Sequence, residues 1–168
     1  MSHVLVMGVC GCGKSLVGSA ITERLGATFV EGDEFHPPEN VAHMKAGHPL
    51  DDQMRFGWLD AIGDAVAAMQ GRAVIACSAL KASYRERLSA KIGDMLIVHL
   101  TGKPGLLEER VTQRKAHFMP ASLVASQFAV LEPPSGPMTI EIDVALTPDE
   151  VVERAVAFIR SADARSVA

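Results

Sequence analysis

The sequence predicts a three-layer α/β fold built on a five-stranded parallel sheet. Short apolar runs, each typical of a buried strand, alternate with segments of helical periodicity along the 168 residues. The connections between these runs are long enough for the crossovers that parallel strands need. One glycine-rich motif lies directly between the first predicted strand and the first predicted helix. We therefore expect a single domain over residues 1–168.

The predicted elements have recognisable start and stop signals. The apolar runs that predict strands are 3–7, 27–30, 73–77, 95–100 and 139–144, and the last alternates polar and apolar residues as an edge strand does. Helical patterns cover about 14–25, 39–46, 52–71, 82–92, 104–115, 121–131 and 148–160. Thr147-Pro148-Asp149-Glu150 forms a capping box before the last helix. Residues 161–168 are expected to form a frayed tail.

The composition excludes several classes of protein. Hydrophobic residues make up 48% and charged residues 21%, which excludes a disordered chain. A net charge of −4 gives no general attraction to nucleic acid or to an anionic membrane, so neither is expected as a partner. The N-terminus lacks the features of a signal peptide, and no window holds the roughly 20 apolar residues of a spanning helix. These observations predict a cytoplasmic protein. The odd number of cysteines, Cys10, Cys12 and Cys77, argues against a disulfide framework.

The motif after the first strand matches the phosphate-binding pattern Gly-x-x-x-x-Gly-Lys-Ser/Thr. Its members are Gly8, Val9, Cys10, Gly11, Cys12, Gly13, Lys14 and Ser15. Glycine lets the backbone pass close to a phosphate, and the N-terminus of the following helix attracts the anion. Lys14 can reach the outer phosphates of ATP, and the Ser15 hydroxyl can ligate Mg²⁺. A chance glycine-rich turn is the alternative, and the flanking strand and helix disfavour it.

Asp33 and His36 follow the second predicted strand, at the edge of a parallel sheet where ligands collect. A kinase that phosphorylates an alcohol needs a carboxylate to hold the attacking hydroxyl and to take its proton. Asp33 suits that role, although it could instead only cap the following turn. His36 precedes Pro37 in extended backbone and can either hydrogen-bond a polyol or brace the loop.

Four basic side chains are candidates for contacts with anions. Arg55 can bind a carboxylate bidentately, and Lys81 follows a buried strand by four residues, although each could instead be a solvated surface residue. Arg110 and Arg114 lie on one helix face, where either a triphosphate or neighbouring glutamates would balance their charge. The segment of about 110–132 is expected to form a lid that shields the γ-phosphate from water.

In many P-loop proteins one strand ends in an aspartate that binds the metal, and the corresponding strand of this sequence has no such aspartate. Ala76-Cys77-Ser78 occupies that place, so Mg²⁺ would be held mainly by Ser15, the phosphates and water, with Asp33 as a further candidate. This pattern suits small-molecule kinases better than motor-type ATPases. The guanine-reading motif Asn-Lys-x-Asp does not occur in the sequence, which disfavours a GTPase.

Together these residues resemble the gluconokinase family of small P-loop kinases. Besides the phosphate loop, the resemblance rests on Glu31-Gly32-Asp33-Glu34-Phe35-His36-Pro37, Cys77-Ser78-Ala79-Leu80-Lys81 and Arg114-Lys115-Ala116-His117-Phe118. It runs from about residue 3 to 145 and implies transfer of a phosphoryl group from ATP to D-gluconate, with Mg²⁺, giving 6-phospho-D-gluconate. It also implies a nucleoside-monophosphate-kinase-like fold with a helical, mobile lid, often as a homodimer.

The same resemblance implies roles for single residues. It makes Asp33 the base or the group that orients the attacking hydroxyl. The candidates for gluconate contact are Asp33, His36, Arg55, Lys81 and Gln127, and those for the nucleotide and the transition state are Lys14, Arg110 and Arg114.

The two loop cysteines depart from the family, since many of its members have serines at both positions. A helix N-terminus lowers the pKa of a thiol, and the loop is expected to be an accessible anion site. The sequence therefore predicts that Cys10 and Cys12 make the empty loop sensitive to oxidation and that ATP protects it.

Three other functions stay open at this point. One is a kinase for another small metabolite, such as shikimate, and one is a nucleotide kinase. The third is a nucleotide-binding regulator without catalysis, which would not need Asp33, Arg55 and Arg114 together.

Overall fold

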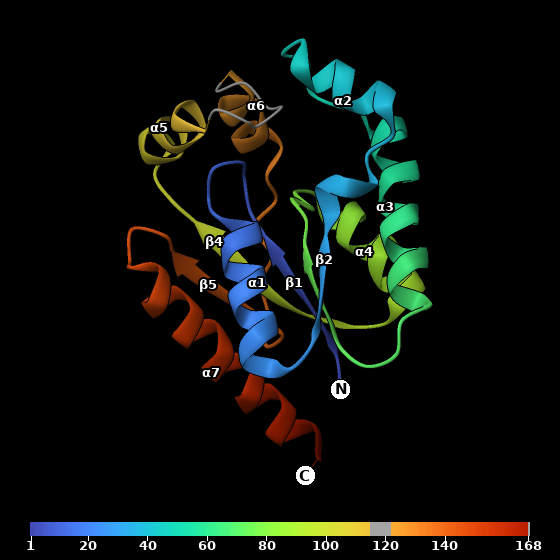
Figure 1. Cartoon of the computed structure of the whole chain (residues 1–168), viewed down its shortest axis with the longest axis vertical. Helices are drawn as coiled ribbons and strands as arrows, with labels where there is room; N and C mark the ends of the chain where they lie inside the picture. Colours follow the sequence, from blue (N-terminus) through green and yellow to red (C-terminus); the bar gives the residue numbers. More distant parts are fainter. Residues whose placement is uncertain (115–121, 168) are drawn as a thin grey trace.

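The computed structural model describes residues 1–114 and 122–167, and it contains the expected parallel sheet (Figure 1). The strands are β1 (His3–Met7), β2 (Thr28–Glu31), β3 (Ala73–Ala76), β4 (Met95–Thr101) and β5 (Thr139–Asp143). Neighbouring strands pair in parallel in the order β2-β3-β1-β4-β5, which confirms β5 as an edge strand. Because β1 is central, the loop that follows it opens where the strand order reverses, the usual ligand site of such sheets.

Helices cover both faces of the sheet, which confirms the three layers. α1 (Lys14–Leu25) and α7 (Pro148–Val167) pack on one face, and α3 (Asp52–Ala67) and α4 (Ala82–Ile92) pack on the other (Figure 1). The remaining helices lie toward the carboxyl ends of the strands: the 3-10 helix η1 (Gly32–Phe35), α2 (Pro38–Lys45), α5 (Pro104–Gln113) and α6 (Ser122–Val130). Of the helices within the described residues, none combines the length and the apolar character that a membrane span needs.

The ends of the helices follow local sequence signals. Gly26 ends α1 in the left-handed conformation, with φ of 61°. Asp51 caps α3, and its Oδ1 accepts the Met54 N–H at 2.8 Å. The capping box of α7 is confirmed, because Thr147 and Glu150 each accept the other's backbone N–H, at distances of 3.3 Å and 2.9 Å.

The prediction of a frayed tail after Arg160 is wrong. α7 continues to Val167, and Ala162 is buried. Arg72, just before β3, donates from both terminal nitrogens to the Asp163 carboxylate, at 2.9 Å and 2.5 Å. This paired contact fastens the last turns of the helix to the body of the protein. Its two partners are 91 positions apart, and no local pattern in the sequence connects them.

The predicted lid at about 110–132 includes the end of α5 and the whole of α6. Its residues 115–121 lie outside the described part of the chain, including the Lys115-Ala116-His117-Phe118 motif. The lid therefore stays a prediction.

Candidate active site

The phosphate loop connects β1 to α1 and depends on glycine at close backbone contacts. Gly8 and Gly11 have φ of 147° and 84°, values that side chains disfavour. A Cβ atom on Gly8 would lie 2.5 Å from the carbonyl oxygen of Leu100, and one on Gly11 would lie 2.6 Å from that of Leu107. Only glycine fits at these two positions, so the neighbouring backbone fixes the wrapped shape of the loop.

Lys14 opens α1, and its ammonium group lies over the loop. Its Nζ donates to the Val9 carbonyl at 3.2 Å and lies 4.0 Å from Cys12 Sγ. Burial lowers the pKa of Lys14, but the neighbouring Cys12 and Asp33 outweigh burial and leave the pKa raised. Lys14 is therefore charged at neutral pH, and it lines a cavity with Ser15 and Asp33, which we call the phosphate cavity.

Ser15, the predicted Mg²⁺ ligand, lies beside a carboxylate that had no predicted role. Burial raises the pKa of Glu31 at the end of β2, and a hydrogen bond with Ser15 opposes that rise. Glu31 also accepts the Asp33 N–H at 3.4 Å. These oxygen groups are of the kind that Mg²⁺ binds. Among the described residues no group of three or more His, Cys, Asp and Glu could hold a metal.

Both loop cysteines are buried, which contradicts the accessible site assumed for their oxidation. Cys10 is 3% exposed and Cys12 is 1% exposed. Burial raises the pKa of the Cys10 thiol, despite the nearby Lys14. A buried thiol with a raised pKa is a poor nucleophile toward oxidants, so the basis of that prediction is wrong.

Asp33 is positioned by η1, a short 3-10 turn that the sequence pattern did not predict. A Cβ atom on Gly32 would lie 2.5 Å from the carbonyl oxygen of Ala76, so the turn can pass β3 this closely only with glycine. The indole Nε1 of Trp58 donates to the Gly32 carbonyl at 2.7 Å. These contacts fix the start of the turn and bring Asp33 into the phosphate cavity with Lys14.

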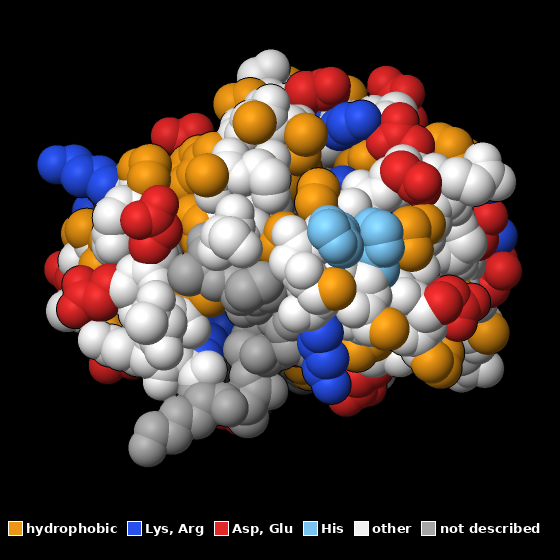
Figure 2. All heavy atoms as spheres, turned by 90° about the horizontal axis from the view of Figure 1, so that it is seen from above, with side chains coloured by type: hydrophobic (Ala, Val, Ile, Leu, Met, Phe, Trp, Pro, Cys, Tyr) orange, Lys and Arg blue, Asp and Glu red, His pale blue; other side chains and the backbone are white. Residues whose placement is uncertain are grey.

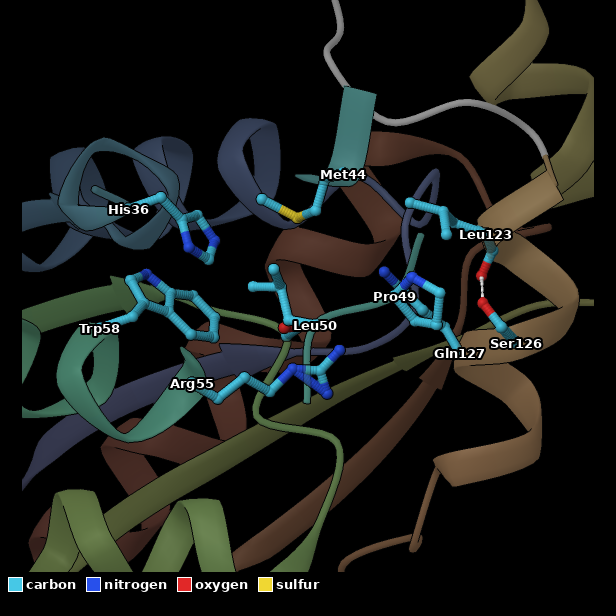
Figure 3. Close-up of a pocket in the computed structure, with 10 residues that line it drawn as sticks. His36, Met44, Pro49, Leu50, Arg55, Trp58, Leu123, Ser126 and Gln127 are labelled. Atoms are coloured by element: carbon cyan, nitrogen blue, oxygen red, sulfur yellow. Dashed lines mark hydrogen bonds between the residues drawn. The ribbon is translucent and has the colours of Figure 1, made fainter. Parts of the chain in front are cut away.

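His36 lies at the end of this turn, stacked on Trp58 (Figure 3). The ring centroids are 4.1 Å apart and the planes differ by 17°. Asn40 Nδ2 lies 3.5 Å from Nδ1 of His36, and Asp33 Oδ1 lies 3.9 Å from its Nε2. With Nδ1 accepting from Asn40, the ring proton is on Nε2 and faces Asp33. Burial lowers the pKa of His36 to about 4, so the ring is neutral at neutral pH.

Arg55 is buried in α3, which excludes the solvated surface position. Only 8% of it is exposed. Its Nη1 donates to the Tyr84 hydroxyl at 3.2 Å, and its guanidinium carbon lies 5.4 Å from the centre of the Tyr84 ring. The Tyr84 hydroxyl donates to Asp52, whose Oδ1 also accepts from Lys81 Nζ at 2.9 Å. Arg55, Tyr84, Asp52 and Lys81 thus form one chain of contacts along the wall of a cavity.

A second cavity, which we call the acceptor cavity, adjoins the phosphate cavity. Its lining comes from η1, α2, α3, α6 and the loops beside them: His36, Met44, Pro49, Leu50, Arg55, Trp58, Ser78, Leu123, Ser126 and Gln127. Figure 3 shows the Arg55 guanidinium extending past Leu50 toward the side of the cavity formed by α6. Ser78 and Gln127 line both cavities, so the two spaces meet at these side chains.

Arg110 and Arg114 border a third cavity beside the phosphate loop. Its walls include Gly11, Leu16 and Val144. Arg110 Nη2 donates to the Val144 carbonyl at 3.0 Å, and Arg114 also lines the phosphate cavity. The prediction that both lie on one helix face is wrong, because α5 ends at Gln113 and Arg114 has extended backbone, yet both side chains border this cavity. An apolar wall with two cations suits the base and phosphates of a nucleotide.

The end of the molecule that carries α2, α5 and α6 shows acidic and basic side chains interspersed (Figure 2). The net charge of −4 likewise gives no broad positive field. Attraction for an anion therefore depends on the few cations that line the cavities.

Several curated gluconokinases match this chain over most of its length. A gluconokinase from Gluconobacter oxydans (strain 621H) is 42% identical over 165 residues, which are 95% of this chain and 92% of that relative. This chain belongs to the gluconokinase family. The crystal structure of a gluconokinase from Sinorhizobium meliloti 1021 matches with a TM-score of 0.88 and 44% identity, covering 99% of this chain and 96% of the other. A search of family models finds no match.

A more distant structure resembles this gluconokinase-family chain in fold alone. Shikimate kinase from Aquifex aeolicus VF5 matches with a TM-score of 0.64 at 12% identity, over 96% of this chain and 98% of the other. The match shows that the two chains share a fold, and it carries no information on the substrate.

The structure distributes the predicted residues of this gluconokinase-family site over four cavities. The phosphate cavity contains Lys14, Ser15, Asp33, Arg114 and Gln127; the acceptor cavity contains His36, Arg55 and Gln127; Lys81 and Arg110 lie in the flanking cavities. Sequence reasoning gave Glu31, Asp52 and Tyr84 no role in the site. Asp52 and Tyr84 meet across 32 positions, and no spacing rule connects two residues that far apart.

Proposed function

We propose that this protein transfers the γ-phosphoryl group of ATP to the 6-hydroxyl of D-gluconate, giving ADP and 6-phospho-D-gluconate. The observation that carries the proposal is the junction of the phosphate and acceptor cavities at Ser78 and Gln127, in a chain of the gluconokinase family. Phosphoryl transfer depends mainly on positioning, so donor and acceptor must share one enclosed space. Two adjoining cavities, one with Lys14 and one with Arg55, meet this requirement.

On the nucleotide side, the proposal assigns the loop N–H groups and Lys14 to the phosphates. Ser15 and the neighbouring Glu31 provide oxygen atoms to Mg²⁺ or to its bound water. When bound, Mg²⁺ neutralises charge on the β- and γ-phosphate oxygens. Arg110 and Arg114 are assigned to the nucleotide and to the charge that develops during transfer.

On the acceptor side, Arg55 and Lys81 are assigned to the carboxylate of gluconate. Neutral His36 can exchange hydrogen bonds with a hydroxyl without adding charge. As the hydroxyl oxygen bonds to phosphorus, the bond from phosphorus to the β–γ bridging oxygen breaks and ADP leaves. The hydroxyl proton passes to the Asp33 carboxylate, which lines the same cavity as Lys14.

A screen for ADP release tests this function. D-gluconate, other sugar acids, shikimate and nucleoside monophosphates are supplied in turn, at fixed ATP and Mg²⁺. We expect the highest kcat/KM with D-gluconate. Turnover with shikimate or a nucleoside monophosphate, and none with gluconate, would identify one of the other kinases. Binding of ATP in calorimetry without ADP release for any acceptor would identify a regulator.

Two finer expectations remain predictions. The homodimer is tested by light scattering of the purified protein, which should give twice the mass of the 17.9 kDa chain. The cytoplasmic location is tested by fractionating cells that produce the protein.

A further inference from the structure

Gln127 of α6 makes a buried hydrogen bond to the phosphate loop. Its Oε1 accepts the backbone N–H of Cys10 at 2.8 Å, joining residues 117 positions apart. The side chain is 6% exposed. Because a backbone N–H can only donate, the amide must present its oxygen to Cys10, and this fixes the orientation of the amide.

The same side chain borders both halves of the site. Gln127 lines the phosphate cavity with Lys14 and Asp33, and it lines the acceptor cavity with His36 and Arg55 (Figure 3). A ligand in either cavity therefore lies against a residue that holds the loop.

The helix that carries Gln127 also forms part of the acceptor cavity. Leu123, one turn earlier in α6, packs against Met44 and Leu50, and all three line that cavity. Just after α6, the Glu132 N–H donates to the Leu80 carbonyl at 2.9 Å, which anchors the end of the helix beside β3. Gln127 lies between these two fixed points, so the position of α6 determines where its amide meets Cys10.

We propose that Gln127 is a positioning residue that couples the binding of gluconate to the binding of ATP. It acts through the Cys10 peptide, which precedes the Gly11 turn of the loop. Gluconate in the acceptor cavity restricts the movement of α6, and this keeps the hydrogen bond between Gln127 and Cys10 in place. The loop then loses less conformational entropy when the phosphates of ATP bind. By linkage, ATP must then tighten gluconate binding by the same factor. This inference rests on the proposed function, because it takes gluconate as the occupant of the acceptor cavity.

Calorimetry on the whole protein tests the coupling. The dissociation constant of a non-hydrolysable ATP analogue with Mg²⁺ is measured with and without saturating gluconate, and that of gluconate with and without the analogue. In the wild type we expect each ligand to tighten the other roughly 2- to 10-fold, the range of one neutral hydrogen bond. In Gln127→Met, which keeps the size and loses the acceptor oxygen, both ratios should fall to about 1.

The ratio of the dissociation constants with and without the other ligand distinguishes coupling from the other roles that Gln127 can have. A direct contact with gluconate, or a purely structural role, would change the affinity to a similar extent with and without the analogue and leave the ratio unchanged. Thermal unfolding with neither ligand present checks that the variant is folded. Gln70→Met is the matched control, because Gln70 is an exposed glutamine that follows α3 and lies outside these cavities. It should keep the wild-type ratio.

A folded Gln127→Met variant with the wild-type ratio would overturn the proposal, as would a wild type with a ratio of 1. Gluconate-dependent ADP release by the wild type is measured first, so that the two failures can be told apart. Release with intact coupling in Gln127→Met overturns the inference alone, and no release overturns both the function and the inference.

Discussion

The phosphate half and the acceptor half of this site are built in different ways. The phosphate half is one continuous stretch, residues 8–15, whose shape depends on backbone contacts such as that of Gly8 with Leu100. The acceptor half gathers side chains from several helices, and Arg55 is oriented through Tyr84 on α4. The first half therefore tolerates little change in its backbone, and the second depends on pairs of side chains that are distant in sequence.

The largest effect is expected at Asp33, which lines the phosphate cavity and faces His36 of the acceptor cavity. Asp33→Asn keeps the shape of the side chain and removes the carboxylate that accepts the hydroxyl proton. We expect kcat to fall about 10²- to 10⁴-fold, the usual range for a lost general base, with an unchanged melting temperature. Glu34→Gln is the control, because Glu34 is an exposed neighbour in the same turn. Near-normal turnover in Asp33→Asn would leave Asp33 with the role of a turn residue only.

A smaller effect, confined to the acceptor half, is expected at Arg55. Arg55→Ala removes the buried cation proposed to bind the gluconate carboxylate and leaves the contact between Tyr84 and Asp52 in place. KM for gluconate should rise roughly 10- to 100-fold, the range of a hydrogen bond to a charged group, while KM for ATP stays the same. Arg87→Ala controls for the loss of an arginine, since Arg87 pairs with Asp60 at 2.7 Å at a partly exposed position. An equal rise in both KM values would contradict a role specific to the acceptor half.

The contrast between the halves also explains how much the sequence could predict. The phosphate loop and the parallel sheet follow from local patterns, because glycine spacing and apolar runs act within a few residues of the chain. The structure confirms the sheet and the turns at the loop glycines. Asp33 could be suspected from its place after a strand, whereas the η1 turn that positions it depends on Trp58, 26 positions beyond Gly32. The pairing of Arg72 with Asp163 and the burial of the two loop cysteines likewise depend on distant parts of the chain.

The phosphate half should respond most to a change in its backbone. Gly8→Ala places a Cβ atom 2.5 Å from the Leu100 carbonyl at a φ of 147°, and a backbone atom cannot move aside as a side chain can. We expect a loss of about 1–3 kcal/mol in the free energy of unfolding, measured in urea. Gly57→Ala in α3 is the control, because no atom lies within 4 Å of the added Cβ. It should gain roughly 0.5–1 kcal/mol, as alanine favours a helix over glycine. Equal effects of the two substitutions would show that close contacts do not define the loop.

The smallest effect belongs to the acceptor half and appears only in acid. Burial lowers the pKa of His36 to about 4 in the folded protein, from an ordinary value of 6.5. Between pH 6.5 and pH 4, His36 binds a proton in the unfolded chain but stays neutral in the folded protein. Lowering the pH through this range therefore favours unfolding. The folded state should lose about 2 kcal/mol between pH 7 and pH 5 through this group, and the loss should be complete below pH 4.

His36→Gln removes the titration, so its free energy of unfolding should fall less over the same range. His48→Gln, at an exposed position near the end of α2, should reproduce the wild-type profile. Parallel profiles for His36→Gln and the wild type would mean that the ring beside Asp33 is as easily protonated in the folded protein as in the unfolded chain.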